Sequence, residues 1–248
     1  MITVQPIRYT AHPEEWHRFA KVLGFVPAFP PERGWSEWDA GGVLAVHQAS
    51  PDRAGRTDFH VRVDDLAVVE AQLEEAGVPF ERSSPFDVGP MLSLVTGCAD
   101  AVSVSGGARA ADSGPLTVLP IWYPDDVPQA RRALEAIGLR PRIGSDSGGW
   151  IDFVADGGGL AALHRDTTTR VELSMEYAGD LDAFAGRLVD AGLEAIVIDE
   201  SYSRTIRVPT PDGDELWING AQNDLYGFTR LDSNPRTGPT GRDDAPPR

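Results

Sequence analysis

The 248-residue chain carries 22 Lys and Arg against 38 Asp and Glu, a formal net charge of −16 at pH 7. Binding to nucleic acid or to an anionic membrane needs a basic surface, so this balance argues against both partners. A single cysteine, Cys98, excludes a disulfide scaffold, a CxxC redox site and a zinc finger. No apolar run approaches the roughly 20 residues of a membrane-spanning helix, and the first residues lack a signal-peptide pattern. We therefore expect a cytoplasmic protein.

The sequence repeats itself from one half to the other. Residues 6–9 (PIRY) return 114 positions later as residues 120–123 (PIWY). Residues 39–48 (DAGGVLAVHQ) return as 156–165 (DGGGLAALHR), which aligns His47 with His164. The order is kept while the spacing drifts by a few residues, so we infer a duplication with small loop insertions.

Each half divides again into two units with one predicted order: a strand, a helix and three strands. The first unit begins at strand 6–9, and its helix ends in Leu-Gly-Phe. The second begins with strand, helix and strand over 59–81. The third repeats the first from residue 120, and the fourth repeats the second over 171–199. Each unit spans about 50 residues.

Alternation assigns the two faces of these strands. Phe59, Val61 and Val63 are apolar and are expected to pack on the helix, so His60 and Arg62 face the other way. A sheet with helices on one side and polar and aromatic residues on the other is expected to curl into a cup. We call the helix-free faces of the two halves the first cup and the second cup.

These features resemble the vicinal oxygen chelate superfamily, which includes glyoxalase I, extradiol dioxygenases and the bleomycin- and fosfomycin-resistance proteins. The supporting motifs are DDLAVVEAQLEEAG, GGVLAVH, GGGLAALH and TPDGDELWI, within residues 2–221. The resemblance implies an α+β fold in which four βαβββ modules form two glyoxalase-like domains with cup-shaped, mostly antiparallel sheets. The predicted segments are a domain at 1–107, a linker at 108–114, a domain at 115–222, and an arm with a disordered tail at 223–248.

The resemblance also implies where metal ligands would lie: on the first strand of a module, and four residues after the glycine of the PDG turn. Counting from Gly213 reaches Trp217, and the matching residue of the second module is Ser103. The other two modules offer alanine there. Counting back from the aspartate before each helix gives the first-strand positions Val4, Asp58, Val118 and about Leu173. We therefore expect no metal cofactor.

A substitute site for a divalent metal remains an alternative, because imidazoles and carboxylates suit zinc, manganese and iron. Its candidate ligands in the first cup are His47, His60 and Glu37. Those in the second cup are His164, Glu172 and Glu215.

Alternation also names the residues of each cup. For the first cup the predicted residues are Arg8, Trp35, Glu37, His47, His60, Arg62 and Ser103. For the second cup they are Trp122, Trp150, Asp152, His164, Glu172, Arg207, Glu215 and Trp217. With three indoles, and three carboxylates against one arginine, the second cup is predicted to be the better site for a neutral or cationic aromatic ligand. The alternative is that the tryptophans simply fill the cup as core.

We therefore predict metal-independent binding of a small, aromatic organic molecule, similar to the drug sequestration of antibiotic-resistance proteins. The first alternative is a lyase, isomerase or dioxygenase with a rebuilt metal site or with acid–base chemistry. In the latter case, His47 and His60 would act as base and acid while Arg62 holds an oxyanion. The second alternative is a scaffold whose cups are vestigial. The chain is expected to be a monomer or a homodimer.

Overall fold

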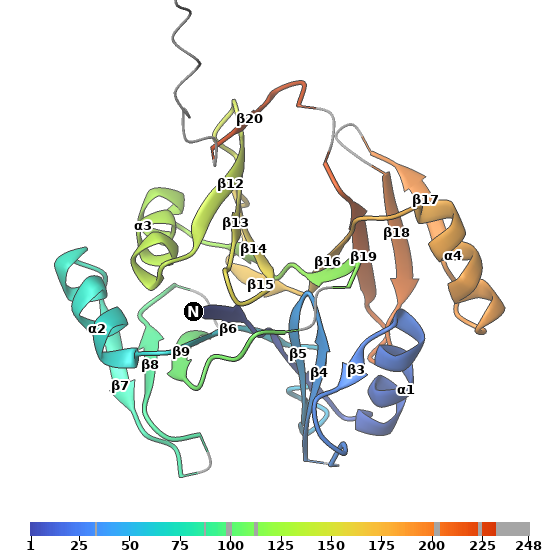
Figure 1. The fold of residues 1–248 in the computed structure, drawn as a ribbon, viewed down its shortest axis with the longest axis horizontal. Coiled ribbons are helices and arrows are strands. Elements are labelled where there is room, and N and C mark those ends of the chain that lie inside the picture. Colours follow the sequence, from blue (N-terminus) through green and yellow to red (C-terminus); the bar gives the residue numbers. More distant parts are fainter. Residues whose placement is uncertain are drawn as a thin grey trace, which may run out of the picture.

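The computed structural model describes residues 1–32, 34–86, 88–97, 101–111, 114–200, 204–222 and 225–231. Within these ranges the chain forms four helices and three sheets, with the helices at the periphery and the strands between them (Figure 1). None of the described helices is long and apolar enough to cross a membrane. The predicted α+β class is confirmed.

The first half of the chain builds one nine-stranded sheet in the order β3-β4-β5-β2-β6-β9-β8-β7, with β1 beside β6. Its elements are β1 (Ile2–Val4), β2 (Ile7–Thr10), α1 (Pro13–Leu23), β3 (Val26–Pro27), β4 (Trp35–Ala40), β5 (Gly42–Gln48), β6 (Thr57–Val63), α2 (Leu66–Glu75), β7 (Phe80–Ser83), β8 (Met91–Leu94) and β9 (Val102–Gly106).

The second half builds a six-stranded sheet, β15-β11-β14-β13-β12-β20, and a five-stranded sheet, β10-β16-β19-β18-β17. Its elements are β10 (Leu116–Val118), β11 (Ile121–Tyr123), α3 (Val127–Ile137), β12 (Arg140–Ser145), β13 (Trp150–Val154), β14 (Leu160–His164), β15 (Arg170–Glu172), β16 (Ser174–Tyr177), α4 (Leu181–Asp190), β17 (Ile196–Asp199), β18 (Arg204–Pro209), β19 (Glu215–Gly220) and β20 (Phe228–Arg230).

The predicted unit of strand, helix and three strands occurs four times. In each unit the first and last strands pair in parallel, and the other pairs are antiparallel. The helices start and stop where local chemistry dictates. The Asp126 side chain accepts a hydrogen bond from the backbone N–H of Gln129, and Gly24 and Gly138 end α1 and α3 in the left-handed conformation, with φ of 101° and 103°.

The two halves differ at the first strand of their second unit. In the first half this strand, β6, is continuous and pairs with both β1 and β2. In the second half it is interrupted at Leu173, so β15 pairs with β11 in one sheet and β16 pairs with β10 in the other. The predicted arm contains strand β20, which pairs with β12. The predicted disordered tail lies outside the described residues from residue 232 onward. The domain boundaries stay predictions.

One apolar core runs through both halves between the sheets and the helices, and it includes Trp16, Trp38, Phe59, Phe153 and Phe184. The duplicated glycines lie where the halves meet. A Cβ added to Gly42, whose φ is +87°, would lie 2.5 Å from the Val118 side chain and 2.9 Å from Gly159 Cα. Glycine is therefore required here for both its backbone conformation and its lack of a side chain.

Candidate functional site

A cavity of about 670 Å³ lies in the second cup. Most of its wall comes from β11, β13, β14, β15, β16 and β19. The first half adds Arg8, Gly55 and Thr57, the end of the second predicted domain adds Gln222, and the C-terminal arm adds Phe228. Volumes of this size are typical of sites for small organic molecules.

One part of this wall is apolar. Leu119, Ile121 and Tyr123 form a small second core with Leu160 and Ala162, on the face of the sheet opposite the main core. Trp150 of β13 packs against this group and lines the cavity, and Trp217 of β19 adds a second indole from the other sheet. A planar ligand can therefore contact aromatic side chains from both sheets.

A buried ion-pair group forms the polar base of the cup. Arg142 lies at an irregularity in the pairing of β12 with β13, and such a bulge redirects its side chain. Its Nη2 lies 2.6 Å from Asp152 Oδ2, and its Nη1 and Nη2 lie 2.9 and 2.7 Å from the two Glu176 oxygens. Burial raises the pKa of Asp152, and the hydrogen bonds from Arg142 lower it again only in part. Arg142 thus joins β13 of one sheet to β16 of the other.

An imidazole faces the cavity between two aromatic rings. The His164 ring centroid lies 5.4 Å from that of Tyr123 and 5.7 Å from that of Trp150. Tyr123 Oη donates a 2.9 Å hydrogen bond to Glu172, which is also ion-paired with Arg170. Burial lowers the pKa of His164, so its ring is neutral at pH 7, and within the described ranges no hydrogen bond reaches either ring nitrogen.

The first half carries a copy of this aromatic cluster. The His47 ring centroid lies 5.3 Å from that of Tyr9 and 5.7 Å from that of Trp35. Asp58, which lies opposite β2, corresponds to Glu172, which lies opposite β11. Burial and the nearby Asp58 carboxylate raise the pKa of Tyr9 to about 12. None of these four residues lines the large cavity.

Ion pairs occupy the rest of the first cup. Arg62 Nη2 lies 3.1 Å from Glu37 Oε1. Arg109, from the segment predicted as a linker, places its Nη2 3.1 Å from Glu37 Oε2 and 2.6 Å from Asp39 Oδ1. Two arginines thus face two carboxylates, and the group is balanced in charge.

His60 lies beside this group and is enclosed by serines. Its Nδ1 is 2.8 Å from Ser103 Oγ, and its Nε2 is 2.9 Å from Ser105 Oγ. Burial lowers the pKa of His60 to about 3, with a smaller contribution from Arg62. The ring is therefore neutral and hydrogen-bonded on both nitrogens.

Solved structures share this architecture over most of the chain. A 2,3-dioxygenase, LapB from Pseudomonas sp. KL28, is 12% identical with a TM-score of 0.59, over 89% of this chain and 91% of that one. A catechol 2,3-dioxygenase is 17% identical with a TM-score of 0.56, over 89% and 87%. An Mn(II)-bound glyoxalase from Novosphingobium aromaticivorans is 13% identical with a TM-score of 0.58, over 88% and 80%. The chain has the vicinal oxygen chelate fold. No protein-family model and no curated protein matches its sequence.

Within this vicinal oxygen chelate fold, the cavity gathers most residues predicted for the second cup: Trp150, Asp152, His164, Glu172, Glu215 and Trp217. Trp122 was predicted there wrongly. It is buried in the main core on the helix side of β11 and lines a separate cavity of about 70 Å³ beside α3. Arg207 pairs with Trp217 across β18 and β19, but it ion-pairs with Glu215 and does not line the large cavity.

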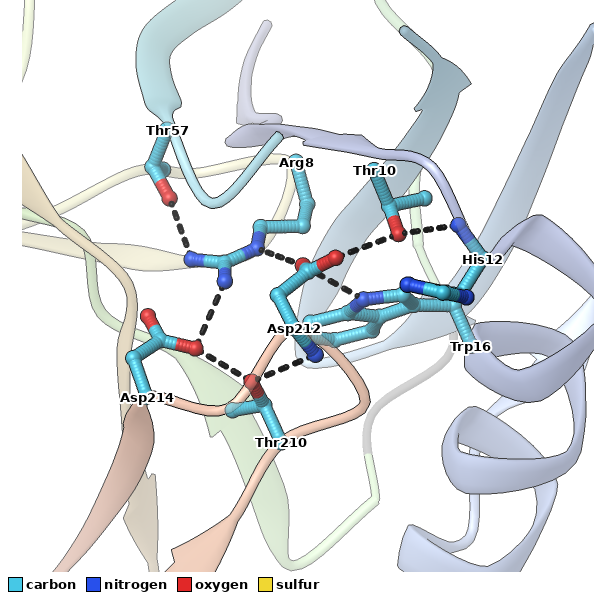
Figure 2. Close-up of polar contacts among 8 residues, drawn as sticks. All are labelled: Arg8, Thr10, His12, Trp16, Thr57, Thr210, Asp212 and Asp214. Carbon is cyan, nitrogen blue, oxygen red and sulfur yellow. Dashed lines mark hydrogen bonds and ion pairs between the residues drawn. The ribbon is translucent and has the colours of Figure 1, made fainter. Parts of the chain in front are cut away.

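The prediction for Arg8 is also wrong. Arg8 lies on the helix side of β2, where its Cζ is 5.1 Å from the ring centroid of Trp16 in α1. Figure 2 shows its guanidinium between Asp212 and Asp214 of the β18–β19 turn, at 2.9 and 2.7 Å. Its end contributes to the wall of the second cup, not of the first.

The two substitute metal sites are not assembled. No three His, Cys, Asp or Glu side chains in the described part of the chain are arranged to hold a metal ion. In the first cup, His60 is bound by serines and Glu37 by arginines. In the second, Glu172 and Glu215 are each held by an arginine. The residues present do not fit a three-residue metal centre in either cup.

The first-strand positions obtained by counting are wrong for two modules, because Val4 and Val118 lie in the main core on β1 and β10, ahead of the first strands of their units. Leu173 belongs to the same core but also lines the large cavity. The proposed base and acid, His47 and His60, are corrected as well. His47 packs between aromatic rings away from the large cavity, and both nitrogens of His60 are hydrogen-bonded to serines, so neither can exchange a proton with a ligand bound in that cavity. Cys98 lies outside the described residues.

Several cavity residues were missed by the sequence prediction: Leu119, Tyr123, Ser174, Glu176 and Asn219. Ser174 and Glu176 follow Glu172 at intervals of two, so extending the alternation by four residues would have found them. Tyr123 aligns with Tyr9 in the repeat. Arg142 carried no local signal, because a bulge sets its direction.

Proposed function

We propose that this protein binds a small organic molecule with an aromatic or aliphatic body in the cavity of the second cup. The carrying observation is that an apolar wall, two indoles and an imidazole with no hydrogen bond from any described residue converge on one space of about 670 Å³. Such a combination gives affinity through apolar burial and orientation through a few polar groups. Sequestration of a drug or natural product is the form of binding that we propose.

The main reason to place the ligand in the second cup is the contrast with the first. The first cup has the same aromatic cluster, but two arginines are ion-paired with Glu37 and Asp39 there. A ligand in the first cup would have to displace those buried ion pairs, at a cost of several kcal/mol.

A second candidate function is an enzyme of the lyase or isomerase type. His164 supports it, because it is neutral at pH 7, faces the cavity, and makes no hydrogen bond within the described ranges. A neutral imidazole beside a bound ligand can accept a proton from it. The similarity to dioxygenases and to a glyoxalase favours an enzyme too.

A screen of small aromatic compounds by ligand-observed NMR tests the proposal. We expect hits that bind the purified protein and are recovered unchanged by mass spectrometry. If wild-type protein converts a hit to a product and the His164→Ala variant does not, the protein is the enzyme of the second candidate function. Stoichiometric iron, manganese, nickel or zinc in the purified protein would overturn metal-independent binding. An absence of hits would contradict both candidates.

A further inference from the structure

We propose that the ligand of the second cup is a cation, a protonated amine or quaternary ammonium carried on an apolar body, an inference that rests on the function proposed above. Three arginines each hold two carboxylates, so each group keeps one formal negative charge; Arg8 and Arg170 line the cavity, and Arg142 lies behind its lining residues Asp152 and Glu176. The groups are Asp152–Arg142–Glu176, Asp166–Arg170–Glu172 and Asp212–Arg8–Asp214.

These groups surround the same space. Asp152, Glu176, Glu172 and Asp214 each line the cavity with at least one atom. Figure 2 shows the third group, in which Asp212 also accepts hydrogen bonds from the Trp16 indole and the Thr10 hydroxyl and is therefore held as a carboxylate acceptor. The remaining carboxylate, Glu215, is paired one to one with Arg207 and adds no net charge.

Burial strengthens the electric field of this surplus negative charge inside the cavity. The side chains of Asp152 and Glu176 are only 3% and 12% exposed, and that of Arg142 is 19% exposed. Charges in such surroundings are screened less by water and salt than surface charges, and a cleft lined with one sign of charge concentrates the field. A cation entering the cup would compensate a negative charge that the protein leaves unbalanced.

The first half supplies an internal comparison, which shows that the surplus does not simply follow from an acidic chain. Arg62 of β6 corresponds to Glu176 of β16 in the repeat, so one position changes from positive to negative between the cups. The first cup balances Glu37 and Asp39 with Arg62 and Arg109. Among the described residues, the second half thus has two carboxylates for one arginine at the place where the first half has two carboxylates for two arginines.

The shape and lining of the cavity define the rest of the ligand. Leu119, Ile121 and Trp150 offer an apolar wall beside the carboxylates. The Trp150 and Trp217 rings can contact either the apolar body or the cationic group, since cations bind favourably over indole faces. The chemical class that matches is a compact aromatic or aliphatic amine that is charged at neutral pH.

Three probes with one indole body and different charges test the proposal: tryptamine, neutral tryptophol and anionic indole-3-propionate. Calorimetric titration at pH 7 is expected to show tryptamine binding about tenfold more tightly than tryptophol, with indole-3-propionate weakest. The preference of wild-type protein for tryptamine over tryptophol should shrink modestly as sodium chloride is raised, because salt screens the half-exposed Glu172 and Asp214 carboxylates but not the indole contact.

Two variants locate the effect. Glu176→Gln should reduce the preference for tryptamine several-fold and leave tryptophol affinity nearly unchanged. The control is Glu74→Gln, which also removes one arginine-paired carboxylate but lies outside the cavity wall, and it should change the preference little. Equal or tighter binding of tryptophol or indole-3-propionate to wild-type protein would overturn the cation assignment while the proposed function stands. If none of the three binds, the cation assignment fails, and hits from the aromatic screen decide the proposed function separately. The wild-type salt series keeps the test decisive if Glu176→Gln does not fold.

Discussion

At the scale of single residues, the two halves use the same positions for different chemistry. His60 is enclosed by Ser103 and Ser105, and burial lowers its pKa to about 3. The matching position of the second half is Ser174, which lines the cavity. A buried ring in the first half thus corresponds to a small hydroxyl in the second, where the side chain lines the cavity.

His60 should make the protein sensitive to acid. An unfolded histidine takes up a proton below about pH 6.5, whereas folded His60 does so only near pH 3. Between these values the unfolded state binds more protons, so stability is retained above pH 6.5 and lost as the pH falls. We expect His60 to account for a loss of about 2 kcal/mol between pH 7 and pH 5.

The measurement is urea unfolding of wild-type protein and His60→Gln at pH 7 and pH 5. Other histidines contribute equally to both proteins, so the difference between the two pH-dependent losses isolates His60. Equal losses in the two proteins would show that His60 is protonated in the folded state well above pH 3.

At the scale of elements, alternation predicted faces well where a strand mixes polar and apolar residues. It placed Trp150 and Asp152 opposite Phe153, and the structure agrees. It failed at β2 and β11. In β11 all three residues are apolar, so alternation cannot tell which of them face the helix, and Trp122 was assigned to the wrong face.

The prediction for Arg8 failed for a different reason. Its charge is paired with Asp212 and Asp214, which lie more than 200 positions away in the sequence. Neighbouring residues in the sequence give no indication of this pairing. The repeat itself was more informative than single-strand patterns: it correctly predicted four units and the position of the duplicated histidines. It could not predict that β15 and β16 separate at Leu173, because that depends on how two sheets pack.

Arg142 should be the main polar tie between those sheets. Arg142→Met would leave Asp152 and Glu176 buried without a positive partner, and breaking such a pair costs roughly 3–5 kcal/mol. The matched control is Arg207→Met, which removes a cross-strand arginine whose ion pair is exposed, for a cost below about 1 kcal/mol. Urea unfolding of both variants checks this, and similar losses would refute the structural role assigned to Arg142.

At the scale of the whole molecule, the halves are joined by glycine contacts and by the Arg8 group. The glycines of residues 41–42 and 157–159 let the two backbones approach, and Gly42 lies next to both Val118 and Gly159. The Arg8–Asp212 ion pair, with both side chains almost fully buried, joins β2 to the β18–β19 turn. The wall of the second cup therefore depends on the first half.

Gly42→Ala tests the close approach of the halves. Both Gly42 and Gly77 have positive φ, so an alanine at either strains the backbone by about 1–2 kcal/mol. A Cβ at Gly77 meets nothing within 4 Å, whereas one at Gly42 overlaps Val118, adding roughly 1–3 kcal/mol. Thermal and urea unfolding should therefore show a larger loss of stability for Gly42→Ala, and equal losses would contradict the close packing of Gly42 against Val118.

Ligand binding in the second cup is tested most directly by calorimetric titration of the tightest aromatic hit into wild-type protein and three variants. Trp150→Ala and Trp217→Ala should each lose a ring contact of about 1 kcal/mol or more, while Trp35→Ala, in the first cup, should bind as wild type does. Unchanged affinity in Trp150→Ala and Trp217→Ala with loss of binding in Trp35→Ala would place the ligand in the first cup and contradict binding in the second.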